Sequence, residues 1–164
     1  MAVGKSTIGS LLANNLNLPF VDLDTEIEKK EQQSVTEIFA NKGEIYFRKA
    51  EHLTLKNLLE QEKSFILSLG GGTPCYANNM ELINQYTSNT FYLKATANTI
   101  IQRLSQEPSF KRPLLNQIEP NQLDEFIRIH LFERSYYYLK AKYTIDTDNN
   151  TIEEVIRTIS NLIL

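Results

Sequence analysis

Four consecutive residues, Gly4-Lys5-Ser6-Thr7, have the types and the order that bind a nucleotide phosphate. In such a loop the backbone N–H groups surround phosphate oxygens, the lysine reaches the β- and γ-phosphates, and the serine hydroxyl coordinates Mg²⁺. Apolar residues at helical spacing follow directly, so the positive N-terminal end of a helix is expected to face the same anion. A short glycine-lysine turn is common on protein surfaces, but this context favours nucleotide binding.

The full pattern of this loop, G-x-x-x-x-G-K-[ST], has a glycine five positions before Gly4, which is upstream of Met1. A strand normally precedes that glycine. We therefore expect the working polypeptide to begin roughly ten residues earlier, the length of a strand plus the first glycine. The missing strand would be the middle one of a parallel sheet.

Two carboxylates, Asp22 and Asp24, follow a short apolar segment that reads as a strand. Ligands of open α/β sheets bind at the carboxyl ends of strands. One carboxylate is therefore expected near Mg²⁺ and the other near a substrate hydroxyl. The alternative is that Asp24 only caps a helix that begins near Thr25.

An arginine and a glutamate, Arg48 and Glu51, are three residues apart in a predicted long helix. Most helical arginines are solvated, but the planar fork of an arginine suits a carboxylate or phosphate, and Glu51 could hold it in place. Arg112 and Arg134 are further candidates for anion contacts. Arg112 belongs to a segment rich in proline, for which we expect a mobile lid.

Three consecutive glycines, Gly70-Gly71-Gly72, follow the most apolar predicted strand. They form either a flexible turn or a place where the backbone approaches a ligand closely, and we favour the second interpretation. His52 and His130 have no partner at ligand spacing and are interpreted as structural. Cys75 has no candidate base nearby and receives no role.

Strands alternate with helices along the whole chain, and the strands are apolar runs. This predicts an α/β fold with three layers, in which helices cover both faces of a parallel sheet. The length fits one domain, residues 1–164. Helices are expected at 5–16, 26–33, 34–43, 44–60, 80–86, 97–104, 122–139 and 151–163, and strands at 19–22, 64–69, 90–93 and 143–146.

The composition is that of an ordinary globular protein, with 41% hydrophobic and 23% charged residues. A net charge of −3 gives no reason to expect a nucleic-acid or membrane partner. A single cysteine fits a reducing compartment, and the sequence leads us to expect neither a signal peptide nor a membrane span. A cytoplasmic protein is therefore expected.

Taken together, these motifs resemble shikimate kinase, a family of the P-loop kinase superfamily. The resemblance extends from residue 1 to about residue 160 and depends on the order of six separate motifs, none of which is specific alone. The motifs are Gly4-Lys5-Ser6-Thr7, Asp22-Leu23-Asp24, Phe47-Arg48-Lys49-Ala50-Glu51, Gly70-Gly71-Gly72, Arg112-Pro113-Leu114-Leu115 and the stretch from Arg134 to Tyr138.

The resemblance implies a five-stranded sheet like that of nucleoside monophosphate kinases, a substrate-binding helical region at about 25–60 and a lid at about 105–121. It implies catalytic roles for Lys5, Asp24 and Arg112, and Mg²⁺ bound by Ser6 and, through water, by Asp22. The residues implied to bind ATP are Ala2, Val3, Gly4, Lys5, Ser6, Thr7, Arg103 and Arg112, with a less clear adenine contact near 150–152. Those implied to bind substrate are Asp24, Arg48, Gly70, Gly71, Gly72 and Arg134, and Phe39 and Phe47 would line the pocket.

The implied activity is ATP-dependent phosphorylation of the 3-hydroxyl of shikimate, a step of chorismate and aromatic amino acid biosynthesis. The implied ligands are ATP, Mg²⁺ and shikimate, and the protein is expected to be a monomer. One alternative is another small-molecule P-loop kinase, which acts on gluconate or a nucleotide. Gluconate kinases would carry a histidine just after the Asp-x-Asp motif, where this chain has Thr25-Glu26-Ile27. The other alternative is a nucleotide-binding relative without catalytic activity.

Overall fold

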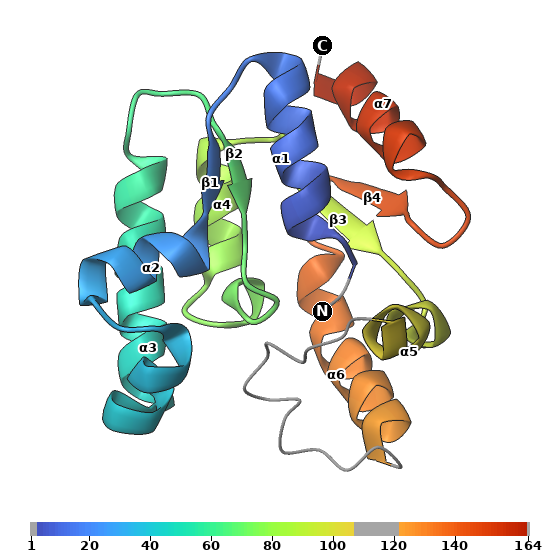
Figure 1. Ribbon diagram of the computed structural model, residues 1–164. Helices are drawn as coiled ribbons and strands as arrows, with labels where there is room; N and C mark the ends of the chain where they lie inside the picture. The colour runs from blue at the N-terminus through green and yellow to red at the C-terminus, as the bar shows by residue number, and fades with distance from the viewer. Residues whose placement is uncertain (1–2, 107–121, 164) are drawn as a thin grey trace.

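The computed structural model describes residues 3–106 and 122–163 and shows alternating helices and parallel strands (Figure 1). The α/β class is therefore confirmed. The elements in order are α1 (Lys5–Leu16), β1 (Phe20–Asp22), α2 (Leu23–Glu31), α3 (Val35–Leu59), β2 (Ile66–Ser68), the 3₁₀ helix η1 (Thr73–Cys75), α4 (Asn79–Tyr86), β3 (Phe91–Lys94), α5 (Ala97–Gln106), α6 (Leu123–Tyr138), β4 (Tyr143–Asp146) and α7 (Ile152–Ile163).

The strands of the described residues form two parallel pairs instead of one five-stranded sheet. β1 pairs with β2 so that Phe20 lies opposite Ile66, and β3 pairs with β4 so that Phe91 lies opposite Tyr143. The five-stranded sheet is thus not confirmed. The strand expected at 64–69 is also shorter, because only Ile66–Ser68 pairs with β1.

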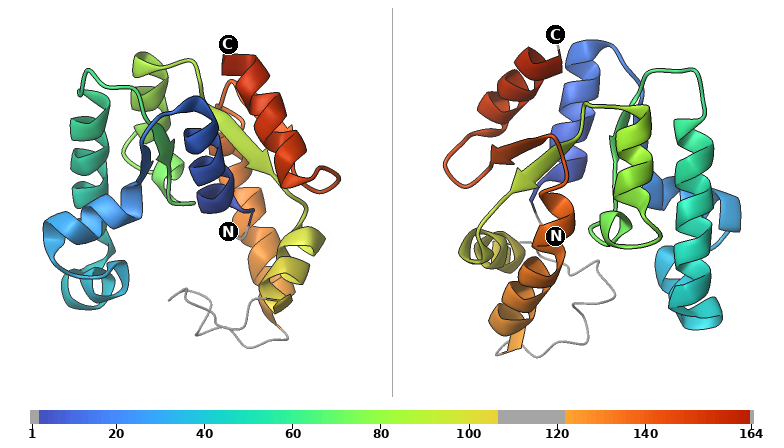
Figure 2. Two further views of the ribbon diagram at one scale, coloured as in Figure 1. Left: turned by 45° about the horizontal axis from the view of Figure 1, so that its top comes forward. Right: turned by 180° about the vertical axis from the view of Figure 1, so that it is seen from behind.

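Helices cover both faces of the strands, as a parallel arrangement requires. In Figure 1, α1 and α7 lie in front of the strands, and the view from behind in Figure 2 shows α4 and α6 on the other side. Helix α1 contacts β1, β2 and α7, so the helix that follows the Gly-Lys-Ser loop joins the two halves of the molecule.

The core is divided into apolar clusters that match this arrangement. One cluster joins α2, α3 and α4 to the first strand pair, and a second joins α1 and α7 to the second pair. A third packs α5 on α6. The first cluster contains Leu23, Ile27, Ile38, Phe47, Leu55, Leu58, Met80 and Ile83.

The S/T-x-x-E pattern of a capping box occurs at Ser34 and at Thr151, and both boxes form in the structure. The Ser34 side chain accepts from the N–H of Glu37, whose carboxylate accepts from the N–H of Ser34. Thr151 and Glu154 make the same reciprocal pair at the start of α7. These bonds satisfy N–H groups that a helix end leaves without an intrahelical partner.

Gly43 interrupts α3, as the sequence predicted for the end of the first of two helices. Its backbone has φ 79° and ψ 171°, a conformation that is essentially restricted to glycine. The interruption sets the direction of the following segment, which carries Arg48 and Glu51. None of the helices formed by residues 3–106 and 122–163 combines the length and the apolar character of a membrane span.

We predict that Gly43→Ala lowers the free energy of unfolding by about 1–3 kcal/mol, the cost of forcing a side chain into this backbone conformation. An added Cβ would meet no atom within 4 Å, so the loss comes from the backbone and not from a clash. Urea denaturation measures the effect. Asn41→Ala, at an exposed helical position nearby, is the control and should change stability by less than about 0.5 kcal/mol. Equal stability of Gly43→Ala and the native protein would contradict the backbone assignment.

Candidate active site

The Gly-Lys-Ser loop turns directly into α1. Gly4 is the N-cap of this helix at φ 83°, a left-handed conformation, and its carbonyl accepts from the N–H of Ile8 at 2.8 Å. Among the described side chains, none accepts a hydrogen bond at this cap. The first N–H groups of α1 therefore face outward together with the positive end of the helix, an arrangement that binds anions.

A cavity of about 500 Å³ lies at this end of α1. The loop lines it together with Arg103 of α5, Asn150, which precedes α7, and Ile152, which begins α7. Arg103 is held in place because it donates to the carbonyl of Thr147 at 2.6 Å. The residues that line the cavity are Val3, Gly4, Lys5, Ser6, Thr7, Ile8, Arg103, Gln106, Thr147, Asn150, Ile152 and Val155.

The two carboxylate oxygens of Asp22 make different contacts. Oδ1 accepts from the N–H groups of Asp24 and Thr25 at 3.1 and 3.4 Å, so Asp22 caps α2. The alternative that Asp24 provides this cap is therefore wrong, because α2 begins at Leu23. Oδ2 lies 3.5 Å from the hydroxyl of Ser6.

The pair Ser6 and Asp22 fits a magnesium ion. Mg²⁺ prefers oxygen ligands and is usually held by one or two protein groups, with water and substrate phosphates in the other positions. A hydroxyl and a carboxylate beside a phosphate-binding loop supply this donor set. In the described residues, no group of three or more His, Cys, Asp or Glu side chains forms a metal site of the all-protein kind.

Asp24 sits on the first turn of α2 and faces the glycine turn that follows β2. A Cβ added at Gly70 would lie 3.1 Å from Oδ1 of Asp24. Burial, together with the negative charges of Asp22 and Glu51, raises the pKa of Asp24 to about 6, although Lys5 acts in the opposite direction. A carboxylate with this pKa can accept a proton near neutral pH.

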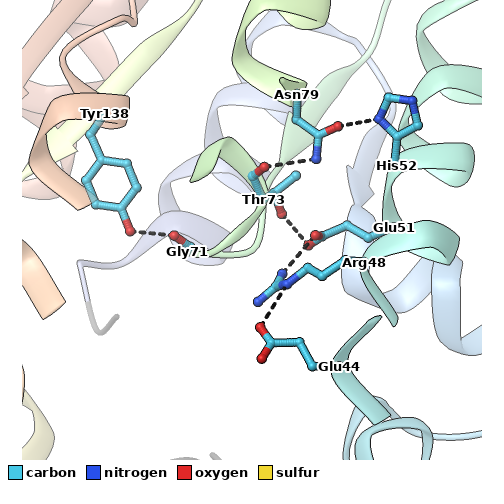
Figure 3. Close-up of polar contacts among 8 residues, drawn as sticks. All are labelled: Glu44, Arg48, Glu51, His52, Gly71, Thr73, Asn79 and Tyr138. Atoms are coloured by element: carbon cyan, nitrogen blue, oxygen red, sulfur yellow. Dashed lines mark hydrogen bonds and ion pairs between the residues drawn. The ribbon is translucent and has the colours of Figure 1, made fainter. Parts of the chain in front are cut away.

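Arg48 is held by two carboxylates, which Figure 3 shows, and by aromatic rings. Its Nη1 donates to Oε2 of Glu51 at 2.8 Å, and its Nε donates to Oε1 of Glu44 at 3.3 Å. The guanidinium carbon lies 4.1 Å from the ring centre of Tyr76 and 5.2 Å from that of Phe47. The prediction that Glu51 holds Arg48 is therefore confirmed.

The three glycines after β2 each face a different side chain of the site. None of the three has the positive φ that favours glycine, since this occurs only at Gly4 and Gly43 among the described glycines. Lack of space favours glycine at positions 70 and 72, whereas a Cβ at Gly71 would make ordinary van der Waals contacts. A Cβ at Gly70 would crowd Asp24, one at Gly71 would lie 3.5 Å from Nη1 of Arg134, and one at Gly72 would lie 2.7 Å from Nη2 of Arg48.

Tyr138 also contacts the glycine turn, although the sequence analysis named it only as the end of the motif that begins at Arg134. Its hydroxyl donates to the carbonyl of Gly71 at 2.5 Å, as Figure 3 shows. Burial raises the pKa of Tyr138, against the positive charge of Arg134. Arg134 and Tyr138 are four residues apart on α6 and so share one helix face, which was the signal available in the sequence.

The surroundings of the two histidines and of Cys75 agree with structural roles. Nδ1 of His52 lies 2.7 Å from Oδ1 of Asn79, and Nδ1 of His130 lies 3.2 Å from the carbonyl of Phe126. Burial raises the pKa of the Cys75 thiol, although Arg134 and Arg48 lower it. Asn79 was not singled out by the sequence analysis.

The structure therefore brings most of the predicted residues into two neighbouring groups, one around the Gly-Lys-Ser loop and one around the glycine turn. Asp22 and Asp24 connect the groups. Two predicted site residues, Ala2 and Arg112, lie outside the described residues, as does the predicted lid except for its first two positions, which belong to α5.

A model of the shikimate kinase family matches residues 1–164. This chain belongs to the shikimate kinase family. A shikimate kinase from Flavobacterium psychrophilum is 44% identical over 163 residues, which cover 99% of this chain and 94% of that protein. The crystal structure of shikimate kinase from Bacteroides thetaiotaomicron, 33% identical, superposes with a TM-score of 0.89 and covers 99% of this chain and 93% of that one.

The shikimate kinase from Acinetobacter baumannii, solved in complex with shikimate, is 34% identical and has a TM-score of 0.87 over 99% of this chain and 88% of that one. Shikimate kinases are transferases, so the family assignment agrees with the phosphate-binding loop and with the carboxylate of raised pKa beside it.

The raised pKa of Asp24 has a consequence for stability. The native-state pKa of about 6 lies above the unfolded value of about 4. The stabilising contribution of Asp24 is therefore complete below about pH 4 and is lost as the pH rises through 6. At pH 7.5 the buried charge is a net cost of about 1–3 kcal/mol.

We therefore predict that Asp24→Asn raises the free energy of unfolding by about 1–3 kcal/mol at pH 7.5 and has little effect near pH 4. Urea denaturation of the Mg²⁺-free protein at several pH values measures this. Asp148→Asn is the control with the opposite sign: burial opposes its charge, but hydrogen bonds from Thr99 and Thr96 outweigh burial and lower its pKa. If Asp24→Asn were no more stable than the native protein at pH 7.5, the raised pKa would be incorrect.

Proposed function

We propose that this protein transfers the γ-phosphoryl group of ATP to the 3-hydroxyl of shikimate, a step of chorismate and aromatic amino acid biosynthesis. The observation that carries this proposal is the glycine turn after β2, which has Asp24, Arg134 and Arg48 around it. A proton acceptor beside two guanidinium groups suits a substrate with both a hydroxyl and a carboxylate. The family assignment supports the same reaction.

The residues around the Gly-Lys-Ser loop bind ATP in this proposal. The backbone from Val3 to Thr7 surrounds the phosphates, Lys5 neutralises their charge, and Arg103 contacts the adenine. Ala2, which is also implied to bind ATP, lies outside the described residues. Arg112, outside the described residues, would reach the phosphates from the lid. Ser6 and Asp22 hold Mg²⁺, which supplies additional positive charge at the phosphates when it is bound.

The residues around the glycine turn bind the acceptor. Arg48 and Arg134 grip its carboxylate, backbone groups of Gly70, Gly71 and Gly72 contact it, and Asp24 orients and deprotonates the attacking hydroxyl. Phosphoryl transfer depends on such positioning and charge neutralisation more than on covalent chemistry by the protein. Two arginines for one carboxylate would reject neutral polyols, because buried charges without partners are costly.

The alternatives receive less support from this geometry. A nucleotide acceptor presents phosphate and a base, and gluconate presents a carboxylate on an open chain. A relative that only binds nucleotide does not need a carboxylate with a pKa of about 6 beside the loop.

We further propose that residues 1–164 form a single kinase domain with a substrate-binding helical region at about 25–60 and a lid at about 105–121. In this proposal the protein acts as a monomer in the cytoplasm, without nucleic acid or membrane partners. The net charge of −3 and the single cysteine support these assignments.

We also propose that the complete sheet has five parallel strands, with the fifth between β2 and β3. A mostly apolar cavity of about 590 Å³ separates these strands and is lined by both. Ser68 of β2 has a buried hydroxyl without a hydrogen-bond partner among the described residues. A buried parallel strand would fill this space and satisfy such polar groups.

The five-stranded sheet predicts that an apolar strand of about ten residues, ending in Gly-x and joined before Met1, raises the thermal stability of the 164-residue chain. The reason is that the strand would pair with both β2 and β3 and fill the cavity. Melting temperature is the measurement, and a Gly/Ser extension of the same length is the control. An equal melting temperature for the two extended proteins would refute the fifth strand.

The proposed reaction predicts that ADP release depends on shikimate. A coupled assay measures ADP release with shikimate, gluconate, a nucleoside monophosphate or no acceptor. This one experiment distinguishes a shikimate kinase from another small-molecule kinase and from a relative that only binds nucleotide. We expect turnover with shikimate and Mg²⁺, and little with the other additions. Turnover with gluconate or a nucleotide, or binding of ATP without any turnover, would favour the corresponding alternative.

In the same assay we expect Arg48→Ala to reduce kcat/KM for shikimate by about a thousandfold or more, with KM for ATP nearly unchanged, because a charged substrate group loses its partner. Arg48→Lys, which keeps the charge for buried Glu51 but loses the planar fork, is the second variant. Arg128→Ala removes an exposed arginine paired with Asp124 and serves as the control. Unchanged shikimate kinetics in both Arg48 variants would contradict the role of Arg48.

A further inference from the structure

A buried chain of hydrogen bonds leads away from Arg48 and returns to α3 at His52, one helical turn further along the same face (Figure 3). It passes from Arg48 to Glu51, then to Thr73 of η1, to Asn79 at the start of α4, and back to His52 of α3. Glu51, Thr73 and Asn79 are at most 1% exposed. We refer to Thr73, Asn79 and His52 as the Asn79 network.

The two oxygens of Glu51 have separate partners. Oε2 accepts from Arg48 at 2.8 Å, and Oε1 accepts from the hydroxyl of Thr73 at 2.7 Å. A buried carboxylate needs such donors, and hydrogen bonds to charged groups are among the strongest in proteins. The Thr73 hydroxyl therefore determines the rotation of the carboxylate, and through it the position of Arg48 Nη1.

Asn79 holds Thr73 in place for this bond. Its Nδ2 donates to the carbonyl of Thr73 at 2.9 Å, and its backbone N–H donates to the carbonyl of Tyr76 at 2.9 Å. The orientation of the amide follows from these contacts, since only Nδ2 can donate to a carbonyl. Oδ1 then faces Nδ1 of His52 at 2.7 Å, which requires a proton on that ring nitrogen.

The position of Arg48 matters because its guanidinium has a competing contact. The exposed carboxylate of Glu44 accepts from Nε at 3.3 Å, and exposed pairs of this kind are weak and mobile. Glu51 is the buried partner, and with Nη1 fixed there, Nη2 lies against Gly72. A rotation of Glu51 would therefore move the edge of the guanidinium that faces the glycine turn.

We propose that the Asn79 network positions Arg48 for the substrate carboxylate, acting through Glu51. The proposal rests on the proposed function, in which Arg48 binds that carboxylate. Thr73, Asn79 and His52 are thus positioning residues that touch neither substrate in this arrangement. They affect the binding of the acceptor. They do not affect the binding of the nucleotide or the rate of the chemical step.

The experiment compares Thr73→Val, which removes the hydroxyl at nearly constant shape, with Thr73→Ser, which retains it. Thr54→Val is a matched control, because Thr54 lies buried on the same helix α3 and its hydroxyl has no hydrogen-bond partner among the described residues. At the other end of the hydrogen-bond chain, His52→Leu removes the Nδ1–H donor to Asn79. His52→Asn instead places an amide N–H near the position of Nδ1.

We expect Thr73→Val to raise KM for shikimate about tenfold, as the loss of a hydrogen bond to a charged group implies. KM for ATP and kcat should change less than about threefold, and Thr73→Ser should recover most of the loss. His52 is half-buried, so the fold should tolerate a substitution there more easily than at buried Thr73. His52→Leu should raise KM for shikimate about threefold, and His52→Asn should recover this loss. Thr54→Val should leave all constants unchanged.

If the Asn79 network only stabilised the fold, its variants would give a different result. They would contain fewer folded molecules, which would lower the apparent kcat and leave KM unchanged. The proposal is overturned if Thr73→Val or His52→Leu leaves KM for shikimate unchanged, if only kcat falls, or if Thr54→Val raises KM equally. These outcomes are distinct from failure of the proposed function, in which the native protein itself releases no ADP in response to shikimate.

Discussion

The close approach of three charged side chains to the backbone of Gly70-Gly71-Gly72 is the constraint on which the site depends. Asp24, Arg134 and Arg48 reach this turn from α2, α6 and α3. Any Cβ at Gly72 would overlap the guanidinium of Arg48. The turn after β2 therefore contains three residues without side chains, and helices that are distant in the sequence can present their charges to one small region.

Two carboxylates near this turn have different environments. Glu51 is surrounded by donors from Arg48 and Thr73, so it serves as a fixed anchor. Asp24 is desolvated near other negative groups, which raises its pKa to about 6 and reduces stability at neutral pH. Such strain in a functional group is a common property of active sites. The rigid pair and the titrating group together suit a site that must fix an acceptor and accept its proton.

Helix α1 connects this region with the nucleotide side of the molecule. The N-terminus of α1 forms one wall of the loop cavity, and its length packs against β1, β2 and α7. Ser6 on α1 and Asp22 at the end of β1 meet where the two regions join. The geometry of phosphoryl transfer therefore depends on the packing of one helix between two strand pairs.

Features that depend on neighbours along the chain follow from the amino-acid sequence alone. These include the Gly4 turn into α1, the capping boxes at Ser34 and Thr151, the alternation of helices and strands, and the pairing of Arg48 with Glu51 at helical spacing. Local hydrogen bonds and periodicity specify each of them.

The contacts between distant segments come instead from the folded structure. It brought Tyr138 to Gly71 and joined Thr73 and Asn79 to α3. It also divided the described strands into two pairs. The physical reason is that these bonds depend on how helices pack across the strands, and a side chain's type and spacing do not specify which distant backbone or side chain it will meet.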